Sequence, residues 1–124
     1  MIHRGIYTEK IRNDGPRKVF LDIIDKHKVD LVIQGHDHTY MRTYQMKNHE
    51  PVSQEKNNYK KGEGTVYALI GSAALKRYDA MDIHAWTAVV KPLPEMNPSY
   101  SVFSFENDSL HCISKLNDGT IYAV

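Results

Sequence analysis

The first third of the chain has the hydrophobic pattern of a helix set between two short strands. Apolar side chains recur at spacings i, i+1, i+4 and i+5, which places them on one helical face: Val19, Phe20, Ile23 and Ile24. Asp14 can cap the start of this helix, and Pro16 suits its first turn. The apolar run at 29–33 is short and rich in β-branched residues, which indicates a buried strand. With a strand stub near the N-terminus, this order predicts a right-handed βαβ unit with parallel strands.

The second half of the chain alternates apolar and polar residues and predicts strands. These predicted strands cover 65–70, 100–105, 110–116 and 120–124. Asp118-Gly119 is a strong hairpin signal before the last of them. The polar stretch at 47–64 predicts an exposed connecting loop. We therefore expect an α/β fold in which a βαβ unit is followed by an antiparallel meander.

Two histidines, one residue apart, follow the predicted strand at 29–33. Side chains at i and i+2 leave an extended backbone on the same side, so His36 and His38 are expected to face one pocket. Gly35, directly before them, allows a sharp turn and a close approach of the backbone to a ligand. Neutral imidazole is a common ligand of zinc, iron and manganese. The pattern therefore favours a metal site over the alternative of two surface histidines in a loop.

A third histidine is expected at the same place. His3 belongs to the first predicted strand, and parallel strands of a βαβ unit end at the same edge, where open α/β sheets bind their ligands. A hydrolytic site with two metals also needs carboxylates. Asp30 lies at the wrong end of its strand, and Asp37 is expected to point away from the two histidines. The missing carboxylates must come from elsewhere, or the site does not hold two metals.

Three further polar residues lie close to the histidines in sequence. Arg4 can grip phosphate oxygens at two points, with plain surface exposure as the alternative. Tyr40 falls on the same side of an extended segment as the two histidines and can brace a ligand ring through its hydroxyl, with ordinary packing as the alternative. Arg42 follows the same alternation but lies further from the edge.

Composition adds little to this picture. Sixteen basic and fifteen acidic residues leave the chain near neutral, which favours neither nucleic acid nor an anionic membrane as a partner. No apolar segment is long enough for a signal peptide or a membrane span. The single cysteine, Cys112, allows no internal disulfide and fits a packed strand residue better than a nucleophile. The cellular compartment stays open.

Two stretches of the sequence resemble the calcineurin-like metallophosphoesterases. They are His3-Arg4-Gly5-Ile6-Tyr7 and the stretch from Gly35 to Arg42, which contains G-H-x-H-x-Y-x-R. They are similar to the last two of five family blocks, and the closest branch is the one that contains purple acid phosphatases. Segments 64–67, 71–73 and 98–102 also resemble the closing strands of that family, so the resemblance spans nearly the whole chain. It implies that His3 and His36 bind one metal and that His38 binds the other.

The three earlier family blocks are D-x-H, G-D-x-x-[DY] and G-N-H-[DE]. In this sequence only three short segments are similar to them in spelling. These are Asp25-Lys26-His27, Asn48-His49-Glu50 and Asp82-Ile83-His84. The first lies on the predicted helix, the second has a lysine in place of the glycine, and the third follows no buried strand. We expect all three to be solvated surface.

The resemblance implies one partial domain, the C-terminal half of a metallophosphoesterase-type α/β/β/α sandwich. Residues 1–46 would form the βαβ unit and ligand loop, 47–64 an exposed loop, and 65–124 a β-rich closing segment. The whole protein would be a phosphoric ester hydrolase that uses a metal-activated hydroxide and two divalent or mixed-valence ions of zinc, manganese or iron.

This chain alone is expected to be inactive on phosphate esters. The N-terminal half or another subunit would complete the sheet, and an exposed strand edge would also allow a homo-oligomer to form. The alternative is a non-catalytic module that binds one divalent ion or serves a structural, oligomerising role.

Overall fold

The computed structural model describes residues 1–8, 15–76, 82–94 and 97–124, and they form a mixed α/β structure that is mostly sheet. Its elements, in chain order, are β1 (Ile2–Arg4), α1 (Gly15–Lys26), β2 (Leu31–Gly35), β3 (Tyr40–Thr43), β4 (Met46–Lys47), β5 (Glu50–Pro51), β6 (Val66–Ile70), β7 (Thr87–Lys91), β8 (Ser99–Glu106), β9 (Ser109–Leu116) and β10 (Ile121–Ala123). The predicted helix and all the predicted strands are present, with boundaries shifted by a few residues.

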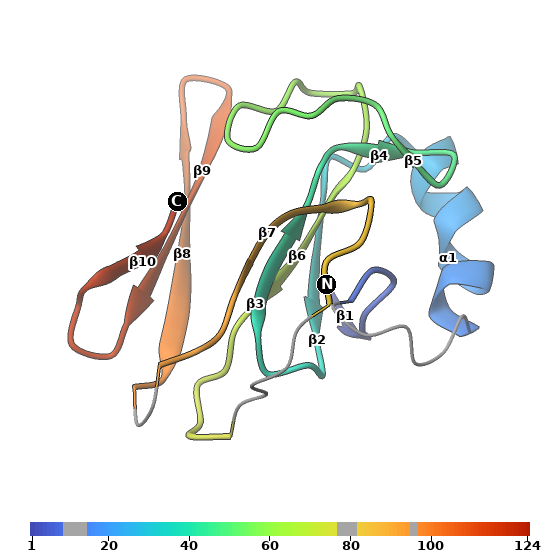
Figure 1. Cartoon of the computed structure of the whole chain (residues 1–124). Helices are drawn as coiled ribbons and strands as arrows, with labels where there is room; N and C mark the ends of the chain where they lie inside the picture. The colour runs from blue at the N-terminus through green and yellow to red at the C-terminus, as the bar shows by residue number, and fades with distance from the viewer. Residues whose placement is uncertain (9–14, 77–81, 95–96) are drawn as a thin grey trace.

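The central sheet has five strands in the order β1-β2-β6-β3-β7 (Figure 1). β1 and β2 are parallel neighbours joined through α1, which confirms the predicted βαβ unit. β6 continues the parallel set, whereas β3 pairs antiparallel with both β6 and β7. We did not predict β3 or β7. All four residues of β3 are buried, the polar Arg42 and Thr43 among them, so this strand has no alternating pattern.

The helix does not bury the face that its apolar spacing predicted. Val19, Phe20 and Ile23 are 60%, 42% and 54% exposed, whereas Leu21 is buried and Ile24 packs against the core. The side of α1 that faces the core begins instead with Arg17. Its guanidinium lies 4.5 Å from the centre of the Tyr7 ring. A cation over an aromatic face thus takes the place of an aliphatic contact on the inner side of the helix. The proposed cap at Asp14 lies outside the described residues.

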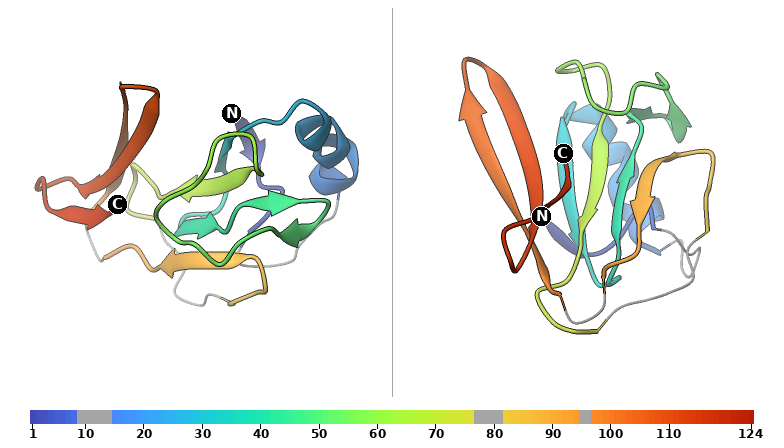
Figure 2. Two further views of the ribbon diagram at one scale, coloured as in Figure 1. Left: turned by 90° about the horizontal axis from the view of Figure 1, so that it is seen from above. Right: turned by 60° about the vertical axis from the view of Figure 1, so that its left-hand side comes forward.

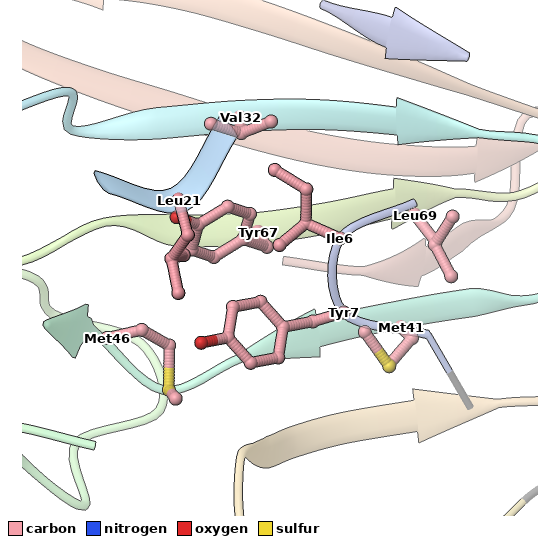
Figure 3. Packing of buried hydrophobic residues seen from close by; sticks show 8 residues of the cluster. All are labelled: Ile6, Tyr7, Leu21, Val32, Met41, Met46, Tyr67 and Leu69. Atoms are coloured by element: carbon pink, nitrogen blue, oxygen red, sulfur yellow. The ribbon is translucent and has the colours of Figure 1, made fainter. Parts of the chain in front are cut away.

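The main core lies between the central sheet and α1. Figure 3 shows its eight clustered side chains: Ile6, Tyr7, Leu21, Val32, Met41, Met46, Tyr67 and Leu69. The rings of Tyr7 and Tyr67 are 4.8 Å apart between centroids, and Trp86 packs 5.4 Å from Tyr7. Trp86 therefore anchors the segment before β7 to this core.

The meander β8-β9-β10 forms a separate three-stranded antiparallel sheet, as predicted. It lies on the opposite side of the central sheet from α1 (Figure 2). Its tight turns contain Asn107, Asp108 and Gly119 with positive φ, a conformation that these residue types tolerate best. Tyr40 and Tyr122 join the two sheets through an edge-to-face ring contact of 5.9 Å.

The segment at 47–64 was predicted to be an exposed loop. Its first residues instead form most of a small hairpin. β4 and β5 pair antiparallel, and the turn between them uses Asn48 and His49, both with positive φ. The rest of the segment is mostly exposed. It is fixed to β3 by Arg42, which donates to the carbonyl oxygen of Lys56 at 2.9 Å.

One buried amide holds the turn after β1 against β2. Gln34 is 2% exposed, and its Oε1 accepts hydrogen bonds from the main-chain N–H groups of Ile6 at 2.5 Å and Tyr7 at 3.2 Å. Its Nε2 donates to the carbonyl oxygen of Tyr7 at 2.8 Å. Three main-chain groups inside the protein therefore depend on a single side chain, since buried polar groups need partners.

Replacing this amide with an apolar side chain should destabilise the fold. We expect Gln34→Leu to lower the free energy of unfolding by about 2–4 kcal/mol, because it leaves buried main-chain groups without partners. Gln54→Leu, at an exposed position, is the matched control and should stay within about 0.5 kcal/mol of the wild type. Urea denaturation measures both, and equal midpoints for the two variants would contradict the role given to Gln34.

Burial of the tyrosine pair makes stability sensitive to alkaline pH. Burial raises the pKa of Tyr7 from 10.0 to about 12, so folding disfavours its deprotonation. The resulting stability is present in full below pH 10 and is lost as the pH rises toward 12. Tyr7→Phe should show a shallower loss than the wild type over this range. Tyr100→Phe, at an exposed position of β8, should follow the wild type.

Candidate metal centre

Two of the three predicted ligands lie against each other. The Nδ1 atom of His36 is 3.4 Å from the Nε2 atom of His3, and the rings meet edge to face with centroids 5.3 Å apart. Two nitrogens that each bind a tetrahedral ion at about 2.0–2.1 Å are separated by roughly 3.3–3.4 Å. This separation therefore suits a shared ion, and it also suits a hydrogen bond between the two rings. Both side chains are exposed, which leaves room for further ligands.

The parallel pairing of β1 with β2 creates this contact. Ile2 is opposite Gln34, and Arg4 is opposite Gly35 after an irregularity in the register, so His3 lies over the end of β2. A Cβ atom on Gly35 would be 3.3 Å from the carbonyl oxygen of His3 and 3.4 Å from its Nδ1. Glycine thus permits the close approach that the sequence predicted for this position.

The backbone turns sharply immediately after this glycine. His36 has a φ of 74°, in the left-handed region that few residues other than glycine adopt. The following residues up to β3 form bends and no strand. Strained backbone of this kind clusters at functional sites, where the surrounding structure holds it in place. The strain here sets the direction of one candidate ligand.

The backbone at His36 and His38 is not extended, although the prediction of a shared pocket required it to be. That prediction assumed an extended backbone, and the left-handed turn at His36 breaks the alternation. The Nδ1 of His38 instead lies 3.0 Å from the carbonyl oxygen of Lys76 and 3.3 Å from the Oγ of Ser72. These partners belong to the loop after β6, at the lower edge of the sheet in Figure 1. Asp37 is 3% exposed and faces the interior, away from the histidine pair.

A complete metal site is not assembled in the part of the chain that the structure describes. Within residues 1–8, 15–76, 82–94 and 97–124, no group of three or more histidine, cysteine, aspartate or glutamate side chains could hold an ion. The structure therefore brings His3 and His36 together. The resemblance assigns His38 to a different metal from these two, and that assignment stays a prediction.

Tyr40 and Arg42 contact the second sheet and the loop at 47–64. The Tyr40 ring packs on Tyr122, and burial raises the pKa of its hydroxyl. Arg42 donates to the carbonyl oxygen of Val124 at 3.0 Å and to the Oδ1 of Asn57 at 3.1 Å. The Tyr40 side chain therefore takes part in packing between the two sheets, and bracing of a ligand ring by its hydroxyl stays a prediction. Arg4 is exposed at the end of β1, and its contact with phosphate stays a prediction.

The three segments that are similar in spelling to the earlier family blocks lie at separate places on the surface. Asp25 accepts a hydrogen bond from the main-chain N–H of Asn48 at 2.8 Å, which fixes α1 to the β4–β5 turn. His84 stacks on Trp86 with ring centroids 4.3 Å apart. Burial raises the pKa of the Cys112 thiol, which disfavours the nucleophilic thiolate. None of these observations adds a ligand to the histidine pair.

Sequence reasoning missed two residues that shape the centre. Gln34 holds the turn next to His3, and Ser72 contacts His38. The one signal for Gln34 was a polar residue in an otherwise apolar strand, directly before Gly35. Ser72 follows Gly71, whose φ of 92° marks a forced turn, but nothing in the sequence links it to a residue 34 positions earlier.

Comparison with protein-family models and with curated protein sequences gave no match. The resemblance to metallophosphoesterases therefore rests on the two histidine motifs. No helix among the described residues is long and apolar enough to cross a membrane.

Proposed function

We propose that this chain carries the C-terminal ligand motifs of a calcineurin-like metallophosphoesterase, in the branch that contains purple acid phosphatases. The complete protein would hydrolyse phosphate esters. The observation that carries the proposal is the 3.4 Å separation of His36 Nδ1 and His3 Nε2, two nitrogens from the two motifs that resemble this family. Two imidazole nitrogens that share one tetrahedral ion need about this separation, and this supports the proposal.

The donors fit an ion of the borderline class, such as zinc, manganese or iron. His3 and His36 would hold one ion through Nε2 and Nδ1, and His38 would contribute to a second through Nε2. Bound ions of this kind lower the pKa of water and offset charge on the phosphate oxygens. The fold itself would position the ligands. The parallel strands and the turn at His36 would hold two of them in place before an ion binds.

The remaining ligands would come from a polypeptide segment beside β1. Among the described strands, β1 is at the edge of the central sheet, so one of its sides is open. The exposed apolar stripe of α1, made of Val19, Phe20 and Ile23, would be covered by the same addition. An edge strand next to exposed apolar residues is a surface that proteins normally cover. The segment can belong to the same polypeptide, to another subunit or to a second copy.

A non-catalytic role is the second candidate. It is favoured because no group of three ligands is assembled among the described residues. Two exposed imidazoles can hold an ion weakly without supplying the charge and the geometry that hydrolysis needs. In this case the chain would be a metal-binding or oligomerising module.

Zinc binding tests the histidine pair. Calorimetric titration should show one site that weakens by about tenfold or more in His3→Ala and in His36→Ala, because each removes one of two ligands. His27→Ala is the matched control, since His27 is exposed at the end of α1 and should leave affinity unchanged. Equal affinity of the wild type and the His3→Ala/His36→Ala double variant would refute the metal centre.

Hydrolysis of p-nitrophenyl phosphate tests the enzyme proposal. With zinc, manganese or iron added, the chain alone should show no turnover above metal blanks, because carboxylate ligands are missing from the described site. Addition of a polypeptide with the D-x-H, G-D-x-x-[DY] and G-N-H-[DE] blocks should produce turnover that His36→Ala abolishes. Metal binding without turnover in that mixture would favour the non-catalytic module. Robust activity of the chain alone would show that its site is already complete.

A further inference from the structure

The turn between β8 and β9 contains a short modification motif. Asn107-Asp108-Ser109 matches N-x-[ST] with a middle residue other than proline, which is the acceptor motif for N-linked glycans. No other asparagine of the sequence starts such a motif. Asn97-Pro98-Ser99 has the hydroxyl at the right spacing but fails because of its proline. The motif therefore occurs once in the chain.

The structure places this motif at the exposed end of a hairpin. Glu106 is opposite Ser109 in the last pair of the ladder, so the loop consists of Asn107 and Asp108. Their φ angles are 47° and 64°, as a type I′ turn requires. All residues from 105 to 110 are exposed, and the hairpin projects beyond the central sheet (Figure 2). A bulky polar group attached to Asn107 would therefore extend into solvent.

Two large apolar side chains next to the motif are also exposed. Phe105 and Leu110 are opposite each other in the ladder and are 82% and 41% exposed. They belong to the face of the hairpin on which the Oγ atoms of Ser101 and Ser114 lie 2.7 Å apart. Ser114 is fully buried, so this face is covered near Ser114 and open near the turn.

We propose that Asn107 is the acceptor of an N-linked glycan and that the first sugar packs on Phe105 and Leu110. Two residues along a strand span about 6.6 Å, a distance that the asparagine side chain and one sugar ring cover together. The C–H groups of a sugar carry partial positive charge and are attracted to the negative face of an aromatic ring. The glycan would cover apolar surface beside β8, which is an edge strand of the described meander.

A tight turn alone explains only part of these observations. Asparagine tolerates positive φ, so the turn accounts for Asn107. It accounts neither for a hydroxyl two residues later, at Ser109, nor for the exposed ring of Phe105. The inference uses none of the three histidines, so it is independent of the proposed function.

The transfer step is a substitution at a sugar carbon. The side-chain amide nitrogen of Asn107 forms a bond to C1 of a sugar that is carried on a lipid diphosphate. The bond between C1 and the diphosphate oxygen breaks, the amide nitrogen loses one proton, and the lipid diphosphate leaves. No oxidant or reductant is needed.

Expression in eukaryotic cells tests the acceptor, with the full chain placed behind a cleavable secretion signal because the transferase acts in the secretory pathway. The wild type should carry one glycan, which peptide N-glycosidase removes and peptide mass spectrometry localises to Asn107. Asn107→Gln and Ser109→Ala should lose it, whereas Ser109→Thr should keep it. Asn58→Gln is the matched control, because Asn58 is exposed but starts no such motif. An unmodified wild-type Asn107, in medium and cell lysate alike, would overturn the proposal.

Urea denaturation tests the packing of the sugar. The glycosylated wild type should have a higher midpoint than the same chain made in bacteria without a glycan. This difference should be lost in Phe105→Ala and kept in Ile121→Ala, a control whose side chain is 59% exposed on β10. An equal effect of the glycan in the wild type and in Phe105→Ala would show that the sugar does not pack on this ring.

Discussion

The parallel pairing of β1 with β2 is the constraint on which the candidate centre depends. β1 has only three residues, so its own ladder to β2 is short. The Gln34 amide extends that ladder by holding the main-chain groups of Ile6 and Tyr7, which follow β1. Gly35 then lets the strands approach until His3 lies over the end of β2. Backbone geometry therefore brings the two histidines of the pair together.

The sequence predicted those helices and strands whose apolar and polar residues follow a regular pattern. The βαβ unit, the buried strand β6 and the three-stranded meander all show clear periods and turn signals, and each is present. β3 and β7 were missed because their burial does not follow a pattern. Arg42 is buried in β3 since it bonds to carbonyl groups of two distant segments, and no local signal reports such partners.

The candidate site was predictable only to the extent that strand topology determines it. Parallel strands bring His3 and His36 to one edge, so their proximity followed from the order of elements. The position of His38 depended on a single dihedral angle at His36, and a left-handed histidine cannot be recognised from residue type. The same applies to the helix. Its apolar spacing indicated a buried face, but Val19, Phe20 and Ile23 are exposed and Arg17 lies on the inner side against Tyr7.

The site loop between β2 and β3 is held at three points, which explains how an exposed loop can keep a defined shape. Its start is fixed by Gly35 against His3, and its middle by His38 on the turn at 72–76. Its end passes into β3, where Tyr40 and Arg42 bind the meander and the loop at 47–64. Each attachment uses a different layer of the protein, so the loop cannot move without disturbing packing elsewhere. If the proposed ligands bind an ion, side chains held in this way would lose little conformational freedom, and preorganisation of this kind raises affinity without adding contacts.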